Sequence, residues 1–147
     1  MKKAVLAAVA VALAAVAVAV VLVLGRHADI ASVADLDRGD CVDAAAFLDG
    51  EQPARADLER ADCDDEHDAE VLMVLELDAD QADSYAPVVP DQVCLDALDD
   101  KTDVTIEDQR LLVAGVADTA SPARGDALAC FGFSADGEPL DGRSTTR

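Results

Sequence analysis

The stretch ADCDDEHDAEVLMVLEL, residues 61–77, sets a cysteine, several acids and a histidine directly before an apolar run. Its last eight residues, 70–77, are rich in β-forming side chains and predict a strand. Successive side chains of a strand point to opposite faces of a sheet, and here both sets are largely apolar. We therefore expect this strand to be partly buried on both faces, inside a small folded domain.

Short elements are predicted on both sides of this strand. Residues 36–43 predict a turn that leads into a short strand, and residues 44–48 predict part of another strand before the turn at Asp49-Gly50. Residues 78–90 predict a loop.

The second half of the chain predicts one helix and two more strands. The helix is expected over 91–100, where Val93, Cys94 and Leu98 share one face at helical spacing. The strands are expected over 110–116 and 128–134. The fold class that follows is α+β, with a small antiparallel sheet and one main helix.

The N-terminus carries a long apolar segment. Lys2 and Lys3 precede an uninterrupted run of 21 apolar residues from Ala4 to Leu24. About 20 such residues suffice to cross a bilayer as a helix. The two lysines favour a cytoplasmic N-terminus, which would place everything after Gly25 outside. A cleaved signal peptide, with Ser32-Val33-Ala34 as its cleavage site, and a buried soluble helix are the alternatives.

The rest of the chain is strongly acidic. The formal net charge is −20, and all 31 acidic residues lie at or after Asp29. Such a surface repels nucleic acid and anionic lipid, because both are polyanions. We expect no nucleic-acid partner. The charge suits solubility, condensation of cations or a basic protein partner.

Four cysteines lie beyond the apolar run, at positions 41, 63, 94 and 130. An even number of cysteines in an exported domain predicts disulfides, and four allow three pairings. Pairing of sequence neighbours, Cys41 with Cys63 and Cys94 with Cys130, would contribute about 3–4 kcal/mol for each loop closed. Zinc binding is the competing interpretation, but there is no C-x-x-C pair and the spacings fit no common zinc motif. With three Phe, one Tyr and no Trp, the core needs such cross-links.

The cluster around His67 is a candidate for metal binding or for catalysis. His67 and Glu70 match half of a zinc motif, but H-E-x-x-H is incomplete and the other histidine, His27, lies beside the apolar run. The neighbouring acids offer oxygen ligands for calcium without the spacing of an EF-hand loop. A catalytic Cys63 would need a free thiolate, which a disulfide removes. We therefore expect no metal, no cofactor and no enzymatic activity.

Several segments occur in the order typical of one family. These are GDCVD at 39–43, ADCDDEHDAEVLMVLEL at 61–77, a helical Cys94, and RGDALACFGFSADGEPLDG at 124–142. The chain resembles the septum formation domain of membrane-anchored actinobacterial proteins over about residues 39–142. The resemblance implies a small disulfide-bonded extracytoplasmic domain, a loose link to septum formation, and no catalysis. That family often has an aromatic residue in the strand before the last cysteine. Here Leu111 or Leu112 would replace it if its role is packing.

Four residues remain as candidates for a partner-binding or structural role: Gly39, Asp40, His67 and Glu70. Gly39 and Asp40 are expected to form a turn and a cap. His67 is expected to bond a backbone carbonyl or a neighbouring carboxylate, with binding of a partner at an exposed rim as the alternative. Tyr85, in a proline-flanked loop, is expected to pack in the core.

The sequence thus predicts an anchor over 1–25, a linker over 26–36, a septum formation-like domain over 37–142 and a tail over 143–147. The expected function is that of a membrane-anchored extracytoplasmic interaction module, which binds an envelope protein through its surface. An acidic cation-binding or structural envelope protein is the alternative.

Overall fold

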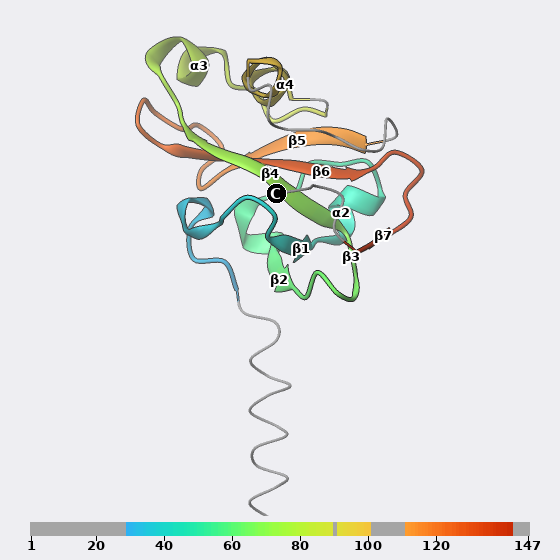
Figure 1. Cartoon of the computed structure of the whole chain (residues 1–147). Coiled ribbons are helices and arrows are strands. Elements are labelled where there is room, and N and C mark those ends of the chain that lie inside the picture. Colours follow the sequence, from blue (N-terminus) through green and yellow to red (C-terminus); the bar gives the residue numbers. More distant parts are fainter. Residues whose placement is uncertain (1–28, 90, 101–110, 143–147) are drawn as a thin grey trace, which may run out of the picture.

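The computed structural model describes residues 29–89, 91–100 and 111–142 (Figure 1). A five-stranded antiparallel sheet in the order β2-β1-β4-β6-β5 forms its centre. The long strand expected at 70–77 is the central strand, β4, and it pairs with β1 on one side and β6 on the other. The strands span Cys41–Asp43 (β1), Glu59–Ala61 (β2), Ala69–Glu76 (β4), Leu111–Ala117 (β5) and Ala127–Ser134 (β6).

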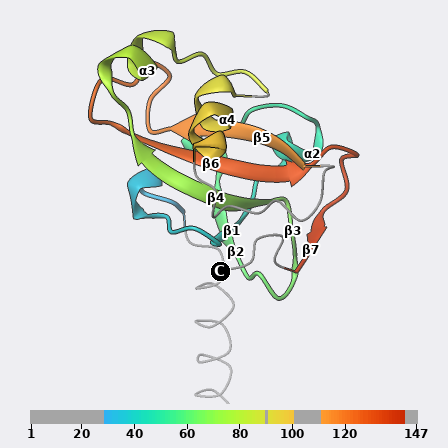
Figure 2. The ribbon, with the colours of Figure 1, turned by 45° about the horizontal axis from the view of Figure 1, so that its top comes forward.

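Helices cover both faces of this sheet. Helices α3 and α4 lie over one face, and α2 with the 3-10 helix η1 lies on the other (Figures 1 and 2). A two-stranded sheet, β3 with β7, stands at one end. The bounds are Val33–Asp35 (η1), Ala45–Leu48 (α2), Arg55–Asp57 (η2), Glu66–His67 (β3), Ala79–Ser84 (α3), Gln92–Asp99 (α4) and Leu140–Asp141 (β7).

The sheet separates two hydrophobic clusters, which confirms that β4 is buried on both faces. One cluster holds all three phenylalanines, with the Phe47 ring 5.4 Å from that of Phe131 and 5.0 Å from that of Phe133. The second cluster lies under α3 and α4 and contains both sulfurs of the Cys94–Cys130 disulfide. Leu112 packs against the first cluster. It is one of the two leucines expected to replace the aromatic residue that the septum formation family often has in this strand.

Both disulfides join sequence neighbours. Cys41 pairs with Cys63 and Cys94 pairs with Cys130, which confirms the predicted pairing. The first bond ties β1 to the loop that follows β2. The second ties α4 to the middle of β6, so the helix cannot leave the sheet without breaking a covalent bond.

Residues 45–48 form a helix, so the strand expected over 44–48 was wrong. Ala45 and Ala46 are strong helix formers, and this local preference outweighs the apolar pattern that indicated a strand. The chain leaves the helix at Gly50, whose φ of 69° lies in the left-handed region typical of a helix end. The short helix places Phe47 in the core, where it is fully buried.

A second helix, α3, lies within the segment 78–90 that was expected to be a loop. Asp78 and Gln81 form a capping box: the Asp78 carboxylate accepts from the Gln81 N–H at 2.8 Å, and the Gln81 side chain accepts from the Asp78 N–H at 3.0 Å. These reciprocal bonds satisfy two backbone donors at the helix start.

The first described residues belong to the packed domain. Ile30, Val33 and Leu36 are buried in the first cluster, although the segment 26–36 was expected to be a linker. The expected membrane anchor, residues 1–25, lies outside the described residues. Within the part of the chain that is described, no helix is both long and apolar enough to span a bilayer.

Candidate functional site

Gly39 and Asp40 form a turn that docks on the central strand. The Asp40 N–H donates to the Asp37 carbonyl at 3.0 Å, and Gly39 has a φ of 85°, as in a type II turn. The Gly39 N–H donates to the Val71 carbonyl, and the Val71 N–H donates to the Asp40 carbonyl, each at 2.8 Å. A side chain at position 39 would strain this backbone, so the glycine is required by the turn.

The same turn recurs on the other side of β4. Gly125 has a φ of 89°, and the Asp126 N–H donates to the Ala123 carbonyl at 3.0 Å. Gly125 and Asp126 also exchange two backbone hydrogen bonds with Leu77. In both turns the aspartate carboxylate accepts a hydrogen bond from the N–H three residues earlier: Asp40 accepts from Asp37, and Asp126 accepts from Ala123. The repeated tripeptide Arg-Gly-Asp is thus a device that leads the chain into a strand beside β4, which assigns Gly39 a structural role.

The Asp40 carboxylate is already engaged. Arg60 Nη1 lies 2.7 Å from Asp40 Oδ2, and Arg60 Nη2 donates to the Asp35 carbonyl at 2.7 Å. The pair joins β2 to the turn before β1. A partner would have to displace this arginine to reach Asp40.

His67 lies inside the domain and is 1% exposed. Its Nδ1 lies 3.0 Å from the Asp65 carbonyl, which places the proton on Nδ1 as the donor. Its Nε2 is buried and has no hydrogen-bond partner among the described residues. This is the backbone contact expected for a structural histidine, and the ring presents no atom to a partner.

Glu70 is fully buried at the start of β4, opposite Cys41 on one side and Gly132 on the other. Cys63 Sγ lies 3.4 Å from the Gly39 carbonyl oxygen, so the disulfide packs on the turn. Gly39 therefore contacts the Cys41–Cys63 disulfide, and Glu70 lies beside Cys41 in the sheet. Over the described ranges, no group of three or more His, Cys, Asp or Glu residues is arranged to hold a metal ion.

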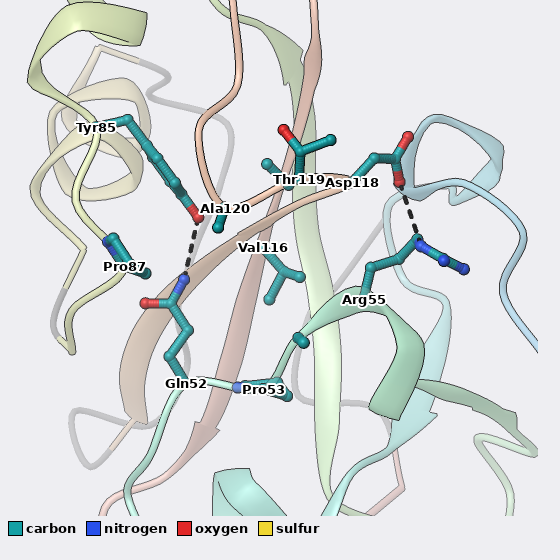
Figure 3. A pocket seen from close by; sticks show the side chains of 11 residues that line it. Gln52, Pro53, Arg55, Tyr85, Pro87, Val116, Asp118, Thr119 and Ala120 are labelled. Carbon is teal, nitrogen blue, oxygen red and sulfur yellow. Dashed lines mark hydrogen bonds and ion pairs between the residues drawn. The ribbon is translucent and has the colours of Figure 1, made fainter.

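A hollow of about 190 Å³ opens elsewhere, at the end of β5 (Figure 3). Tyr85 and Pro87 from the α3–α4 loop form one wall, and Gln52 and Pro53 form the base. Asp118 and Arg55 stand on the opposite side, with Arg55 Nε 4.0 Å from Asp118 Oδ1. The remaining lining residues are Ala54, Val116, Ala117, Thr119 and Ala120.

Polar groups at and next to this hollow cap the outer edge of β5. The Tyr85 hydroxyl donates to the Gly115 carbonyl at 3.3 Å, the Gln52 amide donates to the same oxygen, and the Asp91 N–H donates to the Val113 carbonyl at 3.0 Å. An uncovered edge strand would pair with other chains. These contacts block that edge, so a partner at this site meets side chains rather than a free strand.

Asp91 is a buried acid behind the hollow. Its Oδ1 accepts the Cys94 N–H at 3.0 Å and caps α4, while its Oδ2 has no partner among the described residues. Burial raises the pKa of Asp91, and the backbone donors of Cys94 and Val93 offset part of that shift. Burial, and then the charge of Asp91, raise the pKa of Tyr85 as well.

Comparison with protein-family models, with curated proteins and with solved structures finds no match for this chain. The geometry alone therefore decides between the candidates. Gly39 and Asp40 make contacts within the domain, and His67 and Glu70 are buried in it. Gln52, Tyr85 and Asp118 come together at the surface hollow. The sequence analysis expected Tyr85 in the core, whereas it is partly exposed and packs against the second cluster at the hollow. Sequence reasoning missed Gln52 and Asp118, because the three residues come from segments far apart in the chain and share no motif.

Proposed function

We propose that this chain is a membrane-anchored extracytoplasmic interaction module of the cell envelope, and that it performs no catalysis. The observation that carries the proposal is the pair of buried disulfides, which close one loop from Cys41 to Cys63 and another from Cys94 to Cys130. Disulfides of this kind persist in oxidising compartments and are rare in the cytosol. The apolar run from Ala4 to Leu24 supplies an anchor of sufficient length.

A role in septum formation is the finer part of the proposal. It is supported by the resemblance of residues 39–142 to the septum formation domain. The segments that carry the resemblance include β1, β4, α4 and β6. One disulfide joins β1 to the loop after β2, and the other joins α4 to β6.

Interaction is favoured over catalysis by the placement of the reactive groups. All four cysteines are oxidised, and His67 and Glu70 lie inside the domain. The surface, in contrast, carries most of the acids and an open hollow bordered by Tyr85. A charged surface with few reactive groups is suited to recognition of a basic protein.

Reporter fusions test the location. Alkaline phosphatase, which is active only after export, would be fused behind residue 147, and a fluorescent protein that matures only in the cytoplasm would serve as the matched fusion. We expect phosphatase activity without fluorescence, with the activity in the membrane fraction. Fluorescence without phosphatase activity would contradict an extracytoplasmic domain.

Photo-crosslinking tests the interaction. A photoreactive residue would be placed in living cells at Asp65, which is exposed beside His67, and in a second strain at Thr119. We expect a discrete adduct with an envelope protein from at least one position. Absence of any adduct from both positions, with the chain folded and exported, would contradict a role as an interaction module.

A further inference from the structure

An apolar rim borders the hollow beside Tyr85. Val88, at 53% exposed, is the one large hydrophobic side chain that stands out from the described surface. It directly follows Pro87, which lines the hollow. An exposed apolar residue beside a recess indicates a contact site more than an isolated exposed residue does. The volume of about 190 Å³ is close to that of a cavity that holds a single benzene-sized group.

A second hollow, of about 430 Å³, adjoins the first and is acidic. The two share Asp118 and Thr119 as lining residues. Glu76, at the end of β4, and Asp126, in the second Arg-Gly-Asp turn, lie in its wall, and both residues are exposed. No salt bridge joins Glu76 to a cation among the described residues, which leaves its charge available.

The two hollows differ in charge, and the shared wall separates them. Both carboxylate oxygens of Asp118 accept hydrogen bonds, from the Ser32 hydroxyl and the Val33 N–H, and Arg55 Nε lies 4.0 Å from Oδ1. Arg55 offsets its charge at the first hollow, which is otherwise lined by apolar and uncharged side chains. The second hollow keeps the negative charge of Glu76 and Asp126, since the only described bond to the Asp126 carboxylate comes from the uncharged Ala123 N–H. The pair therefore offers one apolar place next to one anionic place.

We propose that the two hollows form one docking site for an extended segment of a basic protein partner. An aliphatic or proline side chain of that segment enters the first hollow against Tyr85 and Pro87, and a lysine or arginine beside it faces Glu76 and Asp126. The proposal rests on the proposed function, since it names the surface by which the module would act. Charge complementarity to a strongly acidic chain selects the basic partner.

Tyr85 provides the reporter for the test. It is the single tyrosine of a chain without tryptophan, so its fluorescence reports on the first hollow alone. The probe is an acetylated and amidated peptide, Lys-Val-Pro-Lys, and its matched control is Glu-Val-Pro-Glu. Each is titrated into the full chain in a zwitterionic detergent. We expect a saturable change with the lysine peptide and none with the glutamate peptide.

Two variants with the same change in charge show whether the peptide binds at the second hollow. Glu76→Lys alters the second hollow, whereas Glu138→Lys alters the exposed loop before β7, at the other end of the sheet. We expect Glu76→Lys to weaken binding about tenfold or more and Glu138→Lys to leave it within about twofold. Glu76→Gln, which removes charge without reversing it, is expected to fall between them.

Three results would overturn the proposal. The first is absence of saturation with the lysine peptide up to about 1 mM, the range of weak binding by a short segment. The second is equal weakening by Glu76→Lys and Glu138→Lys, which would indicate attraction by the whole acidic surface. The third is displacement of the peptide by calcium chloride but not by sodium chloride at the same ionic strength, which would indicate a cation site. Each leaves the location and the crosslinking tests of the proposed function unaffected.

Discussion

Asp118 Oδ1 accepts a hydrogen bond from the backbone N–H of Val33 at 2.9 Å, across 85 positions of the sequence. Asp118 Oδ2 accepts a second bond, from the Ser32 hydroxyl at 2.7 Å. Asp118 follows β5 directly, so its carboxylate fixes η1, the first element after the expected anchor, to the edge of the sheet. The side chain of Val33 is thereby held in the core, where it is fully buried.

Loss of this carboxylate is expected to release η1. Asp118→Ala leaves the part-buried Val33 N–H without an acceptor and should lower the free energy of unfolding by about 1–3 kcal/mol. Asp118→Asn keeps an oxygen at the position of Oδ1 and should cost less than half of that. Thermal unfolding of both variants gives the comparison, and amide hydrogen exchange at Val33 gives the local effect. Equal protection of the Val33 amide in the alanine variant and the parent would contradict the assignment.

Gly115 is expected to tolerate no side chain. A Cβ at this position would lie 2.9 Å from Asp91 Cγ and 3.0 Å from Cys94 Sγ. Neither neighbour can move freely, because Cys94 is disulfide-bonded and Asp91 caps α4. Gly115→Ala should therefore destabilise the fold by about 1–3 kcal/mol.

A double-mutant cycle checks the cause of that loss. In the background of Asp91→Ala, one of the two clashes is absent, so the cost of Gly115→Ala should fall by about 1 kcal/mol. Denaturant unfolding of the four proteins measures the coupling. Strict additivity would show that the cost arises elsewhere.

The stability of the domain is expected to depend on the protonation of Asp91. Its pKa is raised in the folded protein, mainly by burial, above the unfolded value of about 3.9. The favourable contribution is therefore fully present below pH 3.9 and is lost as the pH rises through the raised folded value. Asp91→Asn keeps the helix cap without the charge and should be more stable than the parent at pH 7.

The pH dependence separates the charge from the cap. The advantage of Asp91→Asn should disappear as the pH falls below about 4, whereas Asp91→Ala should lose about 1 kcal/mol of cap energy at every pH. Urea unfolding from pH 3.5 to 8 measures both. If Asp91→Asn were as unstable as Asp91→Ala at pH 7, the buried charge would not be the source of the effect.

His67 is expected to stabilise the fold through the hydrogen bond of its Nδ1. Asparagine can place an N–H near the position of Nδ1 and keep the bond to the Asp65 carbonyl, whereas glutamine reaches the position of Nε2, which has no described partner. His67→Ala should cost about 2–4 kcal/mol for the cavity and the lost bond, and His67→Asn clearly less. Chemical denaturation ranks the three variants. A glutamine variant more stable than the asparagine variant would place the important contact at Nε2.

The long elements of the fold were predictable from local pattern. The strands expected at 70–77, 110–116 and 128–134 correspond to β4, β5 and β6, and the helix expected over 91–100 corresponds to α4. Each is long enough for its apolar residues to show a period. The number and spacing of the cysteines left three disulfide pairings open, and the structure has the expected pairing of sequence neighbours.

The short elements were not predictable in the same way. The body of α3 has no apolar stripe, and its one signal was the spacing of Asp78 and Gln81, which matches a capping box. In α2, four residues are too few to distinguish a helix from a strand by period. Strands β2, β3 and β7 have two or three residues each, so their existence depends on the partner strand rather than on their own sequence.

The hollow at Tyr85 illustrates why a surface site was harder to predict than the core. Gln52 and Tyr85 are 33 positions apart, and each bonds the carbonyl of Gly115, which is 30 or more positions further along the chain. A backbone carbonyl has no signature in the sequence. The residues around His67 form an obvious cluster because they are adjacent in the sequence, yet His67 and Glu70 are buried inside the domain.

The oxidised state of the cysteines inside living cells tests the central claim most directly. Cells would be quenched in acid and treated with a maleimide carrying a polymer that shifts the electrophoretic mobility, with and without prior reduction. The account predicts an unshifted chain without reductant and four adducts per chain after reduction, from Cys41, Cys63, Cys94 and Cys130. Four adducts without any reductant would contradict a disulfide-closed domain outside the cytoplasm.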